Sequence, residues 1–251
     1  MSTKERCIPS EKLLTWRREF LSRLRGLEPT SPEKPRGVHL SPGNKKTGTT
    51  GKFYGSVFVW NLPAVATCPG ASGWCLEHCY NADPRTDLFP VDDWAKNWWM
   101  VINQPQALYD NIVEQLSGCK EPRAVRLHSS GDFFSPDYVE FWTSVARRAK
   151  DTVFWAYTRS WTITEIVPSL QRFVSLGNVE LFGSWDPTMA EMPPSSWRRS
   201  HVYVDAQEAS NHRRNDRRGL ICPEQMNLVT SCASCGFCMR PISKDVLFYF
   251  H

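Results

Sequence analysis

Residues 124–157 read AVRLHSSGDFFSPDYVEFWTSVARRAKDTVFWAY and carry the pattern that decides the fold class. Residues 124–128 and 152–157 are short apolar runs of the kind found in strands. Between them, Ser135 as an N-cap and Pro136 at the first helical position favour a helix over 136–150. A strand, a helix and a second strand in this order are typical of a βαβ unit in a parallel sheet.

Similar signals on both sides of this unit extend the pattern. We expect further strands at 55–62, 179–182, 201–204 and 246–250, and helices at 10–27, 91–103, 105–117 and 164–176. About six strands are too few for a closed eight-stranded barrel. The sequence therefore predicts an α/β fold, a partial (β/α)6 TIM-like barrel whose functional loops follow the C-terminal ends of the strands.

Three segments follow from this pattern. We expect an N-terminal helix and linker over 1–37, a partial barrel over 38–210, and a cysteine-rich segment with the last strand over 211–251. The residues between 29 and 51 are rich in Pro, Gly, Thr and Lys, which indicates a loop.

Composition excludes several classes of protein. The 251 residues carry a formal net charge of +4 and are 41% hydrophobic, which excludes collagenous, strongly basic and wholly disordered chains. No apolar run approaches the roughly 20 residues that cross a bilayer, and the charged first 25 residues lack the apolar core of a signal peptide. We therefore expect a cytoplasmic protein without membrane contact, in which clustered thiols are metal ligands rather than disulfides.

Seven of the nine cysteines fall in two groups, and Cys7 and Cys119 stand alone. The first group follows the first barrel strand with the spacing C-x6-C-x3-C and consists of Cys68, Cys75 and Cys79. Three thiolates on a 4Fe-4S cluster leave one iron open for a small molecule, which favours that cofactor. With His78 as a fourth ligand the group could instead bind zinc, and unligated structural cysteines are the third alternative.

The second group lies near the C-terminus and consists of Cys222, Cys232, Cys235 and Cys238. Its C-x2-C-x2-C run with a remote fourth cysteine favours an auxiliary 4Fe-4S cluster, with structural zinc as the alternative.

Polar residues at the ends of three expected strands are candidate ligand-binding residues. Gly131 allows backbone to approach a ligand, and Asp132 supplies a carboxylate for an ammonium group. Arg159 could hold a carboxylate, and Ser184 and Asp186 offer a hydroxyl and a carboxylate two residues apart. The alternative for each is an ordinary surface turn.

Five stretches carry a family resemblance: residues 44–48, 61–64, 67–80, 126–134 and 157–159. Together they resemble the radical S-adenosylmethionine (radical SAM) superfamily and, more closely, the phage gene product 88 domain family. The usual superfamily spacing is CxxxCxxC, whereas six and three residues separate the cysteines here.

The resemblance implies a cofactor and its ligands. Cys68, Cys75 and Cys79 would bind a 4Fe-4S cluster whose open iron chelates the amine and carboxylate of S-adenosylmethionine. The other cofactor-binding residues that it implies are Tyr80, Ser130, Gly131, Asp132, Arg159, Ser184 and Asp186. Of these, Ser130, Gly131 and Asp132 would receive the methionine ammonium. Ser184 and Asp186 would lie near the methionine carboxylate and the ribose, and Arg159 is a further carboxylate partner. No catalytic residue is assigned.

The implied activity is that of an enzyme. It would cleave S-adenosylmethionine reductively to a 5'-deoxyadenosyl radical and abstract hydrogen from a substrate in the cytoplasm of a phage-infected bacterial cell. It would also need an electron donor such as flavodoxin or ferredoxin, and the second cluster would relay an electron, ligate substrate or serve the fold.

A basic stretch before Cys222 bears on the substrate. It consists of Arg198, Arg199, His212, Arg213, Arg214, Arg217 and Arg218. With Trp185 and Trp197 as stacking surfaces it could bind nucleic acid, so a modified or hypermodified nucleobase in phage DNA is one candidate substrate, flipped out of the duplex. A solvated basic loop is the alternative, and peptide or small-molecule substrates stay open. The competing function is a non-catalytic zinc or iron–sulfur nucleic-acid-binding protein.

Overall fold

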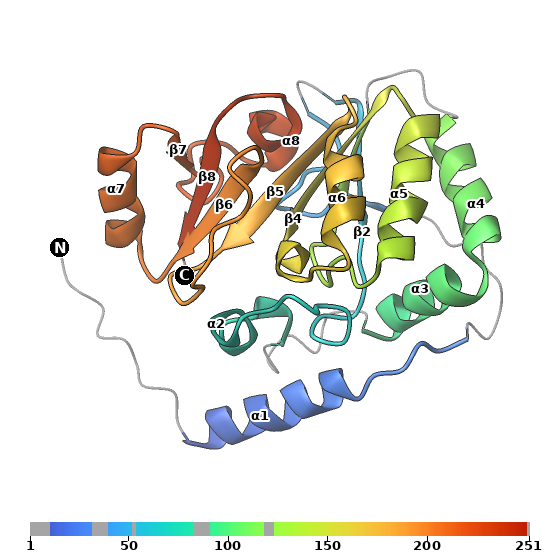
Figure 1. Cartoon of the computed structure of the whole chain (residues 1–251), viewed down its shortest axis with the longest axis horizontal. Coiled ribbons are helices and arrows are strands. Elements are labelled where there is room, and N and C mark those ends of the chain that lie inside the picture. The colour runs from blue at the N-terminus through green and yellow to red at the C-terminus, as the bar shows by residue number, and fades with distance from the viewer. Residues whose placement is uncertain (1–10, 32–39, 52–53, 83–90, 118–122, 250–251) are drawn as a thin grey trace.

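The computed structural model describes residues 11–31, 40–51, 54–82, 91–117 and 123–249, so Cys7 and Cys119 lie outside the described residues. One eight-stranded sheet organises the chain, with the order β1-β2-β3-β4-β5-β6-β8-β7 (Figure 1). Only β1 is antiparallel to its neighbour, and the sheet is open, with β1 and β7 at its two edges. The α/β class is therefore confirmed and the sheet is not closed, whereas the expected partial TIM-like barrel is not confirmed.

The strands have the following bounds: β1 (Ser41–Pro42), β2 (Ser56–Trp60), β3 (Arg123–Leu127), β4 (Thr152–Thr158), β5 (Val179–Trp185), β6 (Arg198–Tyr203), β7 (Gly219–Ile221) and β8 (Asp245–Tyr249). The expected strands at 55–62, 124–128, 152–157, 179–182, 201–204 and 246–250 thus correspond to β2, β3, β4, β5, β6 and β8. Strands β1 and β7 were not expected from the sequence.

The helices have these bounds: α1 (Glu11–Arg25), α2 (Gly73–Glu77), α3 (Val91–Asn103), α4 (Pro105–Ser117), α5 (Pro136–Arg148), α6 (Val167–Val174), α7 (Ala206–Asn215) and α8 (Cys232–Cys235), with 3-10 turns η1 (Tyr80–Ala82), η3 (Ser160–Thr162) and η4 (Phe237–Met239). The start of α5 was expected for the right reason, because the Ser135 hydroxyl accepts a hydrogen bond from the backbone N–H of Tyr138 and Pro136 occupies the first turn. No described helix is long and apolar enough to cross a membrane.

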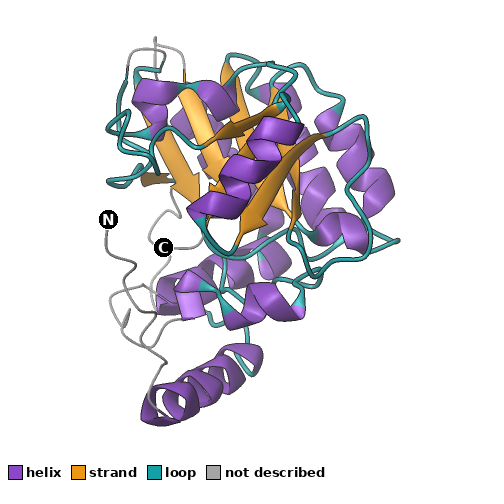
Figure 2. Ribbon diagram, turned by 90° about the vertical axis from the view of Figure 1, so that its left-hand side faces the viewer, coloured by secondary structure: helices purple, strands orange, loops and turns teal. Residues whose placement is uncertain are grey.

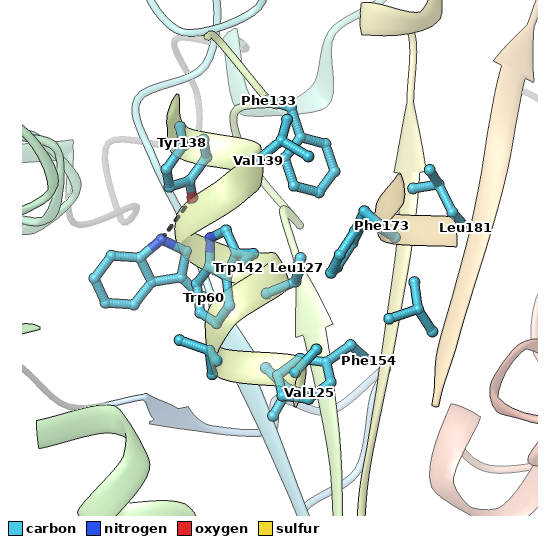
Figure 3. Close-up of a cluster of buried hydrophobic side chains, with 14 of the residues drawn as sticks. Trp60, Val125, Leu127, Phe133, Tyr138, Val139, Trp142, Phe154, Phe173 and Leu181 are labelled. Atoms are coloured by element: carbon cyan, nitrogen blue, oxygen red, sulfur yellow. Dashed lines mark hydrogen bonds between the residues drawn. The ribbon is translucent and has the colours of Figure 1, made fainter. Parts of the chain in front are cut away.

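The largest core lies between the sheet and α3 to α6. Alternate strand residues such as Val125, Leu127, Phe154 and Leu181 point to these helices, and we call this side of the sheet the helix face. Figure 3 shows them against Trp142 and Phe173. The parallel strands from β2 to β6 follow chain order, and right-handed crossovers in one direction place successive helices on the same face.

A buried polar chain runs through this core. The indole Nε1 of Trp60 donates to the Tyr138 hydroxyl at 2.9 Å (Figure 3), and His128 Nε2 lies 2.8 Å from the same oxygen. All three side chains are buried, so the tyrosine hydroxyl satisfies two groups that would otherwise lack partners. Burial and the nearby Arg126 lower the pKa of His128 to about 3, which keeps the imidazole neutral.

The C-terminal segment covers the opposite side of the sheet, which we call the cysteine face. Ala124, Trp155 and Phe182 point to this side and pack against residues of α8 and η4. Arg198 at the start of β6 fixes the segment, because it pairs with Glu180 of β5 at 2.7 Å and donates to the Arg240 carbonyl of the segment at 2.9 Å. The two faces of one sheet are thus covered by different parts of the chain (Figure 1).

Candidate functional site

The carboxyl ends of β2, β3, β4 and β5 meet at one edge of the sheet because these strands are parallel. We call it the strand-end edge. The loop after β2 contains the first cysteine group and folds onto the residues that follow the three neighbouring strands. The sequence predicts that the functional loops lie at this edge.

The cysteine loop, residues 67–80, is anchored by a polar network. Ser72 caps α2 by accepting a hydrogen bond from Cys75 N at 3.0 Å, and its hydroxyl donates to Asp186 Oδ2 at 2.6 Å. The Arg159 guanidinium forms an ion pair with the same Asp186 oxygen, and the other oxygen accepts from Thr188. Arg159 and Asp186 are both buried, so they hold the loop on the ends of β4 and β5.

The electrostatics of Asp186 follow from these contacts. Burial raises the pKa of the carboxyl, but hydrogen bonds from Ser72 and Thr188 and the charge of Arg159 outweigh it and lower the pKa below its ordinary value. Asp186 is therefore a structural anion with its oxygens already engaged. Ser184, two residues earlier, accepts a hydrogen bond from Trp161 Nε1 at its carbonyl, and its hydroxyl makes no hydrogen bond with the described residues.

The thiols of the loop are desolvated. Burial raises the pKa of Cys68 well above its ordinary value, and the charges of Asp132, Cys79 and Cys75 raise it further. Burial also raises the pKa of Cys75, against the opposing charge of Arg159. Neutral thiols result unless a bound cation deprotonates them, and metal coordination does so.

Asp132 supports the loops rather than presenting an open carboxylate. Its Oδ1 accepts from Thr158 Oγ1 at 2.6 Å and Phe133 N at 2.7 Å, and its Oδ2 accepts from Arg159 N at 2.8 Å. A carboxylate has about four lone-pair positions, so three of them are used within the chain. Burial raises the pKa of Asp132, and these hydrogen bonds lower it in part.

The turn at Gly131 brings two loops together. Gly131 has φ +82°, and a Cβ there would lie 2.7 Å from Leu62 Cβ and Thr67 Oγ1. Beside it, the Asn61 side-chain oxygen accepts from Ser129 N at 2.9 Å and Ser130 N at 3.1 Å. Glycine is therefore required by both backbone conformation and space.

Two hydroxyls at this turn have no partner. The Oγ atoms of Ser129 and Ser130 are buried and make no hydrogen bond with the described residues. Buried polar atoms without partners are rare, and an ordered water or a ligand group is one way to satisfy them. Tyr80, in contrast, is 56% exposed and donates its hydroxyl to the Ser129 carbonyl.

His78 is engaged within its own helical turn. Its ring stacks on Trp74 with centroids 4.3 Å apart, and its Nδ1 lies 3.0 Å from the Trp74 carbonyl. Cys79 packs under Phe20 and Leu24 of α1, which lies beyond the strand-end edge in Figures 1 and 2. Helix α1 therefore covers part of the cysteine loop.

The second cysteine group lies on the cysteine face. Cys222 directly follows β7, and Cys235 and Cys238 share an apolar cluster with it, while Cys232 and Cys238 share the adjoining cluster. Burial raises the pKa of Cys232 to about 11 and that of Cys238 to about 12. These thiols form no disulfide.

Neither group has the geometry of a single-ion site. Within the described residues, no three His, Cys, Asp or Glu side chains lie so as to hold one metal ion. Zinc–sulfur bonds of about 2.3 Å in a tetrahedron place thiolates only about 3.8 Å apart. The described thiols are therefore not arranged as a zinc site requires.

The basic stretch divides into two parts with different environments. Arg198 and Arg199 are on β6 and hydrogen-bond to backbone carbonyls, so they serve the fold. Four arginines are exposed, and they are Arg213, Arg214, Arg217 and Arg218. Helix α7 runs from the end of β6 to the start of β7, which places these four at the edge of the sheet opposite the strand-end edge.

The expected stacking role of Trp197 is wrong, because only 4% of it is exposed and it belongs to the main core. Trp185 packs edge-on against His201 with ring centroids 5.6 Å apart.

Of the cofactor-binding residues predicted from the sequence, Asp132, Arg159 and Asp186 lie in one connected network with the cysteine loop. Ser72 and Asn61 were missed. Ser72 could have been found as a residue of N-cap type three positions before Cys75, and Asn61 as a polar residue directly after an apolar strand.

Comparisons with known proteins agree on one family. The family model described as Gene product 88 matches residues 38–241. The Gene 88 protein of Mycobacterium phage L5 is 29% identical over 231 residues, which cover 84% of this chain and 92% of that protein. The Gene 88 protein of Mycobacterium phage D29 is 28% identical over 232 residues, with the same coverage. No solved structure matches the chain.

Proposed function

This chain belongs to the gene product 88 family, and we propose that it is a radical S-adenosylmethionine enzyme with a 4Fe-4S cluster on Cys68, Cys75 and Cys79. The observation that carries the proposal is the cysteine loop itself. It brings three thiols, two of them desolvated, to the strand-end edge without a fourth cysteine in the loop, and three thiolates on a 4Fe-4S cluster would leave one iron open.

The residues around the loop fit the cofactor. When bound, the cluster and S-adenosylmethionine supply one-electron cleavage to a 5'-deoxyadenosyl radical that removes hydrogen from substrate. The Ser130 hydroxyl has no partner among the described residues and so offers a contact to the methionine ammonium, while Gly131 packs against Leu62 and Thr67 and sets the turn that carries it. Arg159 and Asp186 orient the cysteine loop through Ser72, and Asp132 fixes the neighbouring turn.

The strand order supports a partial barrel. Five parallel strands in chain order, with helices on one face, form a singly wound sheet like a segment of a TIM barrel. The cysteine face then corresponds to the barrel interior, and the second cysteine group would hold an auxiliary 4Fe-4S cluster there. We place the protein in the cytoplasm of the infected host, where flavodoxin or ferredoxin could supply electrons.

The substrate proposal is a modified nucleobase of phage DNA. The four exposed arginines support contact with phosphates, but they lie at the edge opposite the cofactor loops. A DNA strand bound there would have to pass around the sheet to present a base, so these arginines would serve recruitment rather than base recognition.

The test is anaerobic reconstitution followed by iron and sulfide analysis, and then dithionite reduction with S-adenosylmethionine. We expect about eight irons per chain, from two clusters of four, and formation of 5'-deoxyadenosine. Cys75→Ser should lose about half the iron and all of the nucleoside. Cys222→Ser, the matched control, should lose the other iron and keep cleavage.

The competing function is a metal-dependent nucleic-acid-binding protein, which the same exposed arginines favour. It predicts bound zinc or an inert cluster, no 5'-deoxyadenosine, and DNA binding that weakens with salt and with replacement of the four arginines by glutamine.

A further inference from the structure

Arg126 lies on β3, on the cysteine face of the sheet, and has no role in the network that anchors the cysteine loop. Its Nε is fully buried without a hydrogen-bond partner, and it forms no ion pair with any described carboxylate. Its guanidinium lies 5.7 Å from the centre of the Tyr157 ring. Arg126 as a whole is half-buried, and a cation whose Nε is enclosed without a partner is costly unless an anion compensates it at some stage.

The groups around Arg126 identify that anion. The acidic groups that act on its charge are the phenols of Tyr80 and Tyr157 and the thiols of Cys232 and Cys238. Tyr157 in turn faces Cys238. A hydrogen bond from its hydroxyl acts to lower the pKa of the Cys238 thiol, which favours the thiolate. The thiols and phenols are neutral on their own, whereas four cysteine thiolates around an iron–sulfur cluster carry net negative charge.

Geometry connects Arg126 to the second cysteine group, because the Tyr157 ring beneath its guanidinium packs in one cluster with Cys232 and Cys238. The charge of Tyr80, which immediately follows Cys79, also acts on Arg126. A fixed positive charge in this position favours the reduced, more negative state of a cluster, since net charge and burial set cluster reduction potentials.

We propose that Arg126 is a positioning residue for the redox state of the C-terminal centre: its positive charge raises the reduction potential of a 4Fe-4S cluster held by Cys222, Cys232, Cys235 and Cys238. The inference rests on the proposed function only for the presence of that cluster. It does not depend on cleavage of S-adenosylmethionine.

The test uses the full chain with Cys68, Cys75 and Cys79 all changed to serine, so that only the C-terminal cluster is present. Its midpoint potential is measured by anaerobic redox titration with detection by electron paramagnetic resonance. We expect Arg126→Gln to lower the equilibrium constant for reduction at least tenfold, a shift of about 59 mV for a one-electron couple. Arg126→Lys keeps the charge and should keep most of the potential.

Arg172→Gln is the matched control, because this arginine pairs with Glu140 among the helices on the helix face and its loss should leave the midpoint unchanged. Equal midpoint potentials of the parent and Arg126→Gln would overturn the proposal. Zinc in place of iron at the C-terminal site of the triple-serine chain would overturn it as well. If the unaltered protein forms no 5'-deoxyadenosine while Arg126→Gln still shifts the midpoint potential, the result counts against the proposed function alone.

A second measurement applies if Arg126→Gln fails to assemble the cluster. In the metal-free protein Arg126→Gln removes an unpaired, half-buried charge, so its melting temperature should equal or exceed that of the parent. A lower melting temperature would mean that Arg126 serves the fold alone and would overturn the proposal.

Discussion

We predict that Gly131→Ala destabilises the strand-end edge by about 2–5 kcal/mol. The backbone there has φ +82°, and a side chain in the left-handed region costs about 1–2 kcal/mol. The added Cβ would also lie 2.7 Å from Leu62 Cβ and Thr67 Oγ1 and 3.0 Å from the Leu62 carbonyl oxygen. Crowding of this kind costs about a further 1–3 kcal/mol, because part of the obstacle is backbone.

The assay is equilibrium unfolding of the metal-free protein in guanidinium chloride, supported by thermal melting. For a chain of this size each kcal/mol shifts the melting temperature by about 2–4 °C, so the variant should melt roughly 4–20 °C lower. Gly73→Ala is the matched control on the same loop system, since nothing lies within 4 Å of a Cβ built there. Its stability should stay within about 0.5 kcal/mol of the parent. Equal stabilities of the two variants would refute the reasoning from conformation and close approach.

Two further predictions concern buried polar groups. Tyr138→Phe leaves Trp60 Nε1 and His128 Nε2 without their shared partner and should lower the free energy of unfolding by about 2–4 kcal/mol, measured by guanidinium denaturation. Tyr109→Phe removes a hydroxyl with no hydrogen bond to the described residues and should be nearly neutral, so similar losses in both variants would contradict this account. Because the pKa of Asp186 is lowered on folding, its contribution to stability is complete above about pH 4 and is lost as the pH falls through the folded pKa. Asp186→Asn should therefore be the less stable protein at pH 6 and approach the parent in acid, and a difference that does not change with pH would contradict the assignment.

The parallel core was predictable because its strands are apolar on both sides. Residues 124–128 and 152–157 were expected as strands and correspond to β3 and β4, whose alternate residues enter clusters on opposite faces. The amphipathic pattern of 136–150 gave α5 within two residues, because its capping chemistry is local.

Helix α7 was missed because it has almost no apolar stripe. Only Ala209 of its ten residues is buried, so hydrophobic periodicity gave no signal. The local signal was Asp205, which caps the helix by accepting from the N–H groups of Gln207 and Glu208. Strands β1 and β7 have two and three residues, too few for any pattern to be recognised.

The sequence predicted which residues belong to the candidate site better than it predicted what each residue does there. Sequence position at strand ends was enough to gather Asp132, Arg159 and Asp186. It could not reveal that their polar atoms satisfy one another and Ser72, since those partners are up to 114 positions apart in the chain. For the same reason charge alone did not separate the half-buried Arg198, which pairs with Glu180, from the exposed arginines of the basic stretch.

The two edges of the open sheet have a consequence for how the protein behaves at high concentration. An open sheet exposes unpaired backbone groups at its margins, and long flat margins invite strand addition by another chain. Here one margin is a two-residue strand that contains Pro42, which has no N–H to donate, and the other is only three residues long. The sheet can therefore stay open without recruiting a second molecule to complete it, and crowded expression in a cell should not drive edge-to-edge aggregation.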